Sequence, residues 1–161
     1  PEADLTAVAV SQAIDLINAR EWLGPDTPVI VLGGRGFIGR RVVKMLERST
    51  TFSIDSADGQ GKNDWPNLDG KRVIVVNATL NNAIKDYVDV LSPGTVVINE
   101  VYPEPSSDIL EKLSDKDCCC YHVVGVDATA FPSFPSAYQG AIPCCAAWPS
   151  DNLKVVVRKL N

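Results

Sequence analysis

The feature that most constrains the fold is a short apolar segment that runs into a glycine-rich loop and then into a helical pattern. Residues 29–32 (V-I-V-L) are typical of a buried strand. Gly34, Gly36 and Gly39 follow in G-x-G-x-x-G spacing. The apolar positions of the next helix are Val42, Val43, Met45 and Leu46. This order predicts a pyrophosphate site, because glycines permit a tight turn and close backbone approach while the first helical N–H groups bind an anion. A purely structural turn between strand and helix is the alternative interpretation.

A carboxylate stands where such a unit binds ribose. Asp55 ends a second expected strand, residues 51–55, about 20 residues after Gly34. It would accept hydrogen bonds from the adenosine ribose and disfavour a 2′-phosphate, which predicts NAD as the cofactor. Arg35 in the loop can stack on adenine or pair with a phosphate, so NADP remains open. A solvated turn aspartate is the alternative interpretation for Asp55.

A third segment completes the predicted cofactor site. Asn77, Ala78 and Thr79 close the expected strand 72–77, where a dinucleotide-binding sheet places small polar groups beside the cofactor. A turn or a helix cap would explain them equally well. The full set of predicted cofactor-binding residues is Gly34, Arg35, Gly36, Phe37, Ile38, Gly39, Asp55, Asn77, Ala78 and Thr79.

Strand and helix patterns alternate along the rest of the chain. Further strands are expected at 95–99, 121–126 and 153–157, and helices at 5–19, 83–91 and 106–113, with a linker at 22–28 and a loop at 56–70. This alternation predicts an α/β fold, a Rossmann-like doubly wound and mainly parallel sheet with helices on both faces. Ligands bind such sheets at the C-terminal ends of the strands.

Length and charge restrict the organisation and the partners. The 161 residues suit one dinucleotide-binding domain, with a leading helix and linker over residues 1–27 and the Rossmann core over residues 28–161. The chain starts at Pro1 and its only methionine is Met45, so we expect a domain excised from a larger chain. The net charge of -5 disfavours nucleic acid and anionic membranes as partners. With no apolar run long enough for a membrane span and no signal-peptide pattern, we expect a cytoplasmic protein.

The remaining reactive side chains are expected to be structural. His122 is the only histidine and lies in an apolar strand, which favours a packed or surface side chain over a catalytic base. The clusters at 118–120 and 144–145 hold the five cysteines without C-x-x-C spacing, so we expect reduced thiols and no metal site. The segment 131–135 (F-P-S-F-P) is expected to form an ordered loop, either a lid or a docking surface for another domain.

Three stretches resemble, in order, the cofactor-binding half of the shikimate and quinate dehydrogenase family. Residues 75–79 (V-V-N-A-T) are similar to its I-N-A-T stretch, and residues 97–105 to its D-x-x-Y-x-P stretch. Residues 139–141 (Q-G-A) followed by Trp148 resemble its closing Q-G-A…W segment. The family resemblance implies a two-domain oxidoreductase that transfers hydride between NAD(P) and a small polar substrate, with a separate N-terminal domain supplying a catalytic lysine and aspartate.

The same resemblance implies that Tyr102 and Gln139 face the substrate cleft. The chain departs from the family in its loop, which reads G-G-R-G-F-I-G instead of G-A-G-G. That loop is also similar to the one in extended short-chain dehydrogenases and epimerases, but no tyrosine here is followed four residues later by the lysine of their Tyr-x-x-x-Lys pair. A non-catalytic dinucleotide-sensing or scaffolding module of a larger polypeptide is therefore the alternative function.

Overall fold

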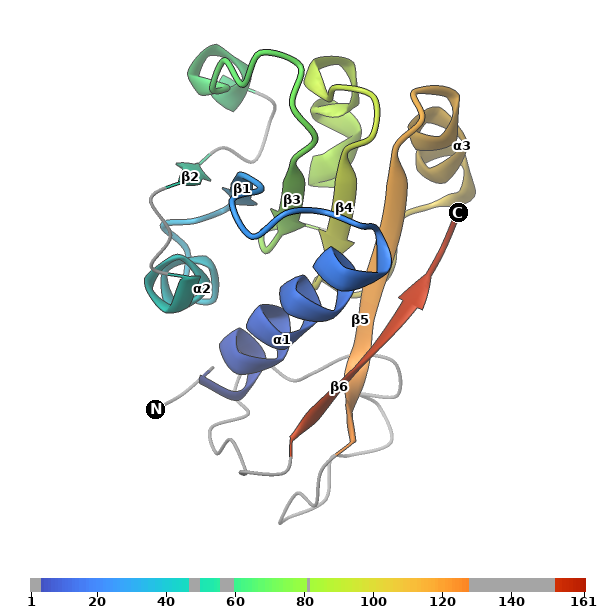
Figure 1. Ribbon diagram of the computed structural model, residues 1–161. Coiled ribbons are helices and arrows are strands. Elements are labelled where there is room, and N and C mark those ends of the chain that lie inside the picture. The colour runs from blue at the N-terminus through green and yellow to red at the C-terminus, as the bar shows by residue number, and fades with distance from the viewer. Residues whose placement is uncertain (1–3, 47–49, 56–59, 81, 128–152) are drawn as a thin grey trace.

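Six strands form a single sheet in the computed structural model, which describes residues 4–46, 50–55, 60–80, 82–127 and 153–161 (Figure 1). The strands lie in the order β2-β1-β3-β4-β5-β6. The first five strands, β1 to β5, are mutually parallel, and β6 runs antiparallel to β5. Their bounds are β1 Val29–Leu32, β2 Thr51–Ile54, β3 Ile74–Asn77, β4 Val96–Asn99, β5 Cys119–Asp127 and β6 Lys154–Lys159. The prediction of an α/β fold with a mainly parallel sheet is confirmed.

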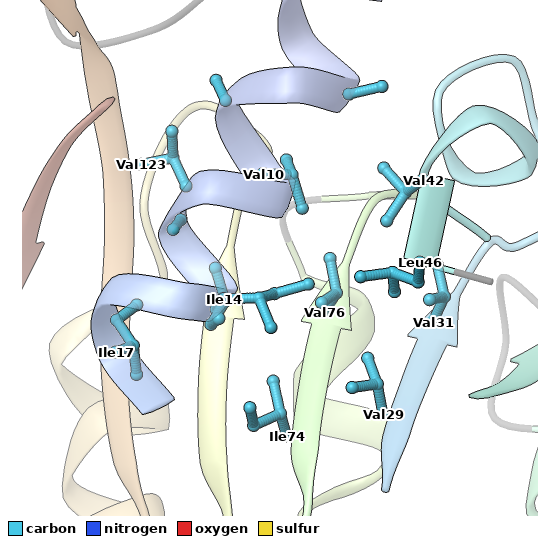
Figure 2. Close-up of a cluster of buried hydrophobic side chains, with 14 of the residues drawn as sticks. Val10, Ile14, Ile17, Val29, Val31, Val42, Leu46, Ile74, Val76 and Val123 are labelled. Atoms are coloured by element: carbon cyan, nitrogen blue, oxygen red, sulfur yellow. The ribbon is translucent and has the colours of Figure 1, made fainter. Parts of the chain in front are cut away.

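Helical segments cover both faces of this sheet, which explains why β1, β3 and β4 are buried along their whole length. One face packs against α1 (Asp4–Arg20) and α2 (Gly39–Leu46), and Figure 2 shows Ile14 of α1 and Leu46 of α2 against Val76 and Val31. The opposite face packs against η2 (Ala83–Asp86), η3 (Val88–Val90) and α3 (Ser107–Asp115). The side chains of β1 alternate between these two clusters, as the two-residue period of a strand requires.

Two expected elements differ from the structure in type. The single helix expected at 83–91 is instead a pair of 3₁₀ turns, η2 and η3. Ile84, Tyr87, Val88 and Leu91 are buried at the spacing expected of a helix, but this spacing is shared by both kinds of helical turn. β-branched residues and aspartates make the segment a poor α-helix former. Part of the loop expected at 56–70 forms another 3₁₀ turn, η1 (Gln60–Asp64).

Hydrogen bonds at the N-terminal end of the sheet fix the end of α1 to the strands. The Tyr121 hydroxyl donates to Glu21 Oε1 at 2.5 Å, and Lys159 Nζ donates to the same oxygen at 3.0 Å. Arg72 Nη1 donates to the Glu21 carbonyl at 2.8 Å. The Tyr121 hydroxyl in particular holds the pKa of the Glu21 carboxyl below its usual value. No helix in the described ranges is long and apolar enough to cross a membrane.

The strand order contains one reversal of direction, and it positions the candidate site. From β1 the chain moves to β2 on one side, and then returns to β3 on the other side of β1. The connections after β1 and β3 therefore leave the sheet in opposite directions, and sheets of this kind bind ligands at the C-terminal ends of the strands at such a point. The glycine loop follows β1 at this point, and residues 77–79 close β3 beside it.

Candidate functional site

The glycine loop is tightly folded between β1 and α2. The Gly33 N–H donates to the Ile54 carbonyl at 2.7 Å, and the Gly36 N–H donates back to the Gly33 carbonyl at 2.8 Å. Gly33 has a φ of +78°, which favours glycine. A Cβ at Gly34 would overlap the Ser53 side chain, and a Cβ at Gly39 would overlap the Gly33 carbonyl. The first and last glycines of the motif are thus required by close packing, of Gly34 on β2 and of Gly39 between loop and helix.

This fold leaves a group of backbone donors unused. Among the described residues, five N–H groups between β1 and the first turn of α2 have no hydrogen-bond acceptor. They belong to Gly34, Arg35, Phe37, Ile38 and Gly39. Arg35, Gly36 and Phe37 are exposed, so this side of the loop is open to a ligand. Unused amides at a helix N-terminus bind an anionic group, and phosphate is the usual one.

Three arginines add positive charge at the same end of α2. Arg35 and Arg40 are exposed, and Arg41 Nη1 donates to the Phe37 carbonyl at 2.6 Å. The Phe37 ring lies 4.2 Å from the Arg41 guanidinium and 5.8 Å from that of Arg40. The first turn of α2 carries no acidic residue. Cations are unfavourable at a helix N-terminus, because the helix dipole is positive there. Their presence in a chain that is acidic as a whole favours a bound anion, which would compensate the arginines and the dipole together.

Asp55 lies beside the loop, at the end of β2. Because Leu32 pairs with Ile54, Asp55 follows at the level of Gly33 on the neighbouring strand. Its side chain is exposed. This is the position from which a carboxylate accepts hydrogen bonds from ribose in a dinucleotide-binding sheet.

A buried polar network links the last residues of β3 and β4 to β5. Asn77, Asn99 and His122 are paired in register across β3, β4 and β5, and each is at most 2% exposed. Asn77 Nδ2 donates to Asn99 Oδ1 at 3.0 Å and to the Leu80 carbonyl at 2.9 Å. Asn99 Nδ2 lies 3.1 Å from His122 Nδ1 and 2.6 Å from the carbonyl of Val101. The network fixes the strand ends, because each buried amide must keep a partner.

Of the packed and surface positions left open for His122, the structure shows the packed one, and the sequence did not identify Asn99 as its partner. Asn77 and Thr79 were predicted to line the cofactor path. Asn77 is in fact buried, and its Oδ1 accepts from the Thr79 N–H at 3.4 Å. Ala78 and Thr79 are half-buried and pack against Gly33. Of these three residues, Ala78 and Thr79 remain in a position to contact a ligand.

Glu100 is a second residue that the sequence pattern did not reveal. It follows β4 directly and its N–H donates to the Asn77 carbonyl at 3.1 Å, so the pairing with β3 continues through it. The residue is only 7% exposed. Its carboxyl group has no hydrogen bond or ion pair with any described residue. Burial raises its pKa from 4.5 to about 7. The sequence signal that could have pointed to Glu100 is a carboxylate directly after a buried apolar strand.

The other predicted candidates are less closely tied to the site. Tyr102 lies two residues beyond Glu100 and is 61% exposed. Gln139, Trp148, the segment 131–135 and the cysteines at 144–145 lie outside the described residues.

The three described cysteines behave as structural residues. Cys118 and Cys120 are buried in the core cluster with α3, Cys119 is half-buried toward the opposite face, and all three are free. Burial raises the pKa of Cys119 to about 11 and that of Cys120 to about 12, so neither thiol ionises near neutral pH. Within the described ranges, no group of three histidine, cysteine or acidic side chains is placed to hold a metal ion.

Two comparisons with known proteins found no match. No known family model matches the chain, and no curated protein matches its sequence significantly.

Proposed function

We propose that this chain binds a nicotinamide dinucleotide at the loop after β1, as the cofactor domain of a two-domain oxidoreductase. Hydride would pass between the nicotinamide and a small polar substrate held against a partner domain. The observation that carries the proposal is the set of five unused N–H groups in a loop whose glycines cannot accept a side chain. Such a loop is shaped for a pyrophosphate, whose oxygens accept from backbone amides.

Each end of the cofactor has residues suited to it. The pyrophosphate would lie on the amides of 34–39, and Asp55 would accept from the adenosine ribose hydroxyls. The exposed Arg35 and the Phe37 ring are available to stack on adenine. From the pyrophosphate the cofactor would pass over Ala78 and Thr79 toward β4. When bound, the nicotinamide supplies the hydride chemistry, and Tyr102 and Gln139 are proposed to face the substrate.

The choice between NAD and NADP depends on two opposing charges. The Asp55 carboxylate beside the ribose site repels a 2′-phosphate and favours NAD. Arg35 and Arg40 are exposed on the adjacent loop and would attract that phosphate. We propose NAD as the cofactor because the carboxylate follows β2 directly at the level of Gly33, with NADP as the second candidate.

The proposed compartment follows from the thiols. The three cysteines of 118–120 are free, in keeping with a reducing environment such as the cytoplasm.

Calorimetric titration of the folded chain with NAD⁺, NADP⁺ and ADP-ribose tests the proposal. We expect saturable binding of at least one dinucleotide, and binding of ADP-ribose because it carries the pyrophosphate and both riboses. Gly39→Ala, which places a Cβ against the Gly33 carbonyl, should abolish binding, whereas Gly24→Ala has no neighbour within 4 Å and should bind normally. Folded wild-type protein that binds none of the three would refute the proposed function.

A further inference from the structure

Glu100 occupies the same row of the sheet edge as the glycine loop. Leu32, Asn77 and Asn99 are in register, so the residues that follow them, Gly33, Ala78 and Glu100, form the next row. Hydrogen bonds from the Ala78 N–H to the Leu32 carbonyl and from the Glu100 N–H to the Asn77 carbonyl, both 3.1 Å, continue the pairing through this row. At the usual spacing of neighbouring strands, the backbone of Glu100 lies about 10 Å from that of Gly33.

The Glu100 side chain also lies on the face of the sheet that packs against α1 and α2, and α2 directly follows the glycine loop. Ile98 packs in the cluster with α1 and α2, so Asn99 points to the opposite face and Glu100 returns to the face of Ile98. Ala78 packs against the same cluster. The amides at the start of α2 and the Glu100 carboxyl are therefore on one side of the sheet and at one edge of it.

No charge compensates this carboxyl within the described structure. β3 presents uncharged side chains beside Glu100. On β5, the Tyr121 hydroxyl is bonded to Glu21 at the N-terminal end of the sheet, and His122 is engaged with Asn99 on the other face. The buried positions of α1 are all uncharged. Among the described residues, desolvation by burial is the cause that raises the Glu100 pKa. A buried carboxyl that no described charge compensates is costly to the fold, and such groups cluster at functional sites.

We infer that Glu100 is the counter-charge for the oxidised nicotinamide ring, so that binding of the oxidised cofactor expels a proton from this carboxyl and binding of the reduced cofactor does not. The inference rests on the proposed function. A dinucleotide whose pyrophosphate lies on 34–39 and whose chain passes over Ala78 brings its nicotinamide to the end of β4, where Glu100 is found. The oxidised ring carries a positive charge and the reduced ring is neutral, so only the former favours the carboxylate.

The expected effect follows from the proton that must leave. At pH 6 the free protein holds Glu100 largely protonated, because its pKa is about 7, and at pH 8 it is largely ionised. The oxidised cofactor therefore has to displace a proton at pH 6 but not at pH 8. We expect its affinity to rise about five- to tenfold between pH 6 and pH 8. The affinity for the reduced cofactor should stay level or fall over the same range.

The test compares NAD⁺, NADH and ADP-ribose by calorimetric titration at pH 6 and pH 8. ADP-ribose lacks the nicotinamide and isolates the contribution of the rest of the molecule. Wild-type protein should show the pH-dependent gain for NAD⁺ alone, and Glu100→Gln should lose that gain while still binding ADP-ribose. Glu111→Gln makes the same change at an exposed glutamate on α3 and should behave as wild type.

The outcomes separate the inference from the proposed function. ADP-ribose and NAD⁺ that bind with the same pH dependence would overturn the role of Glu100 and leave the dinucleotide site intact. Protein that binds none of the ligands would overturn both. If Glu100→Gln does not fold, titration of wild type with NAD⁺ at pH 6.5 in PIPES and in imidazole, two buffers with different ionisation enthalpies, decides the question. Proton release makes the two apparent enthalpies differ, and equal enthalpies would refute the coupling.

Discussion

Glu100→Gln is expected to stabilise the protein at alkaline pH, although it removes a native side chain. Glutamine has the shape of a protonated glutamate but cannot ionise. In the fold the pKa of Glu100 is raised by burial from 4.5 to about 7. At about 1.4 kcal/mol for each tenfold change in proton affinity, ionisation of this carboxyl costs the folded state about 3 kcal/mol. Because the folded pKa is raised, the stabilising contribution of the protonated form is complete below pH 4.5 and is lost as the pH rises through 7.

The assay is urea unfolding of wild type and Glu100→Gln at pH 5 and pH 8, followed by circular dichroism. Both proteins pass through the same titrations elsewhere, so the difference between them isolates this site. We expect the variant to be more stable by about 3 kcal/mol at pH 8 and by less than about 1 kcal/mol at pH 5. Glu111→Gln, at an exposed position, should track wild type at both pH values. A difference between wild type and Glu100→Gln that does not change from pH 5 to pH 8 would refute the reasoning.

Three further substitutions test the packing around the site and at the opposite end of the sheet. Gly39→Ala should lower the free energy of unfolding by more than about 2 kcal/mol, because its Cβ meets backbone, whereas Gly24→Ala should change it by less than about 1 kcal/mol; similar urea midpoints would contradict this. Tyr121→Phe removes the hydrogen bond to the Glu21 carboxylate and should lower the free energy of unfolding by about 2 kcal/mol at pH 7. The loss should be smaller at pH 3, because the stability that comes from the lowered pKa of Glu21 disappears as this carboxylate is protonated. A loss in urea unfolding that does not depend on pH would argue against this. Asn99→Leu should cost about 3 kcal/mol because it removes the buried side-chain hydrogen bonds that residue 99 makes to Asn77, Val101 and His122, and an unchanged thermal midpoint would count against the network.

The glycine loop could be predicted from sequence because everything that defines it is local. An apolar strand, three glycines at fixed spacing and a helical stripe lie within residues 29–46. The structure adds the reason for two of the glycines, namely the close approach of Gly34 to Ser53 and of Gly39 to the Gly33 carbonyl. The parallel sheet was equally accessible, since continuous apolar strands alternating with helical patterns permit few other arrangements.

The burial of Glu100 could not be predicted, because it depends on neighbours from elsewhere in the chain. Its backbone pairs with Asn77, and Asn99 beside it is held by His122 on the next strand. Sequence alone shows a glutamate near a proline-rich turn, which is normally an exposed residue. The same limit applies to residues 83–91, where one burial pattern is compatible with an α-helix and with the two 3₁₀ turns that form.

The most direct measurement of the central claim is an amide NMR titration of ¹⁵N-labelled protein with NAD⁺. If the loop amides bind the pyrophosphate, the resonances of Gly34 to Gly39 should shift in a saturable manner, together with those of Ala78 and Thr79. The amides of η3 and α3, which lie on the other face, should stay in place. Loop amides that do not move at saturating nucleotide, or shifts centred on another part of the sheet, would contradict the account.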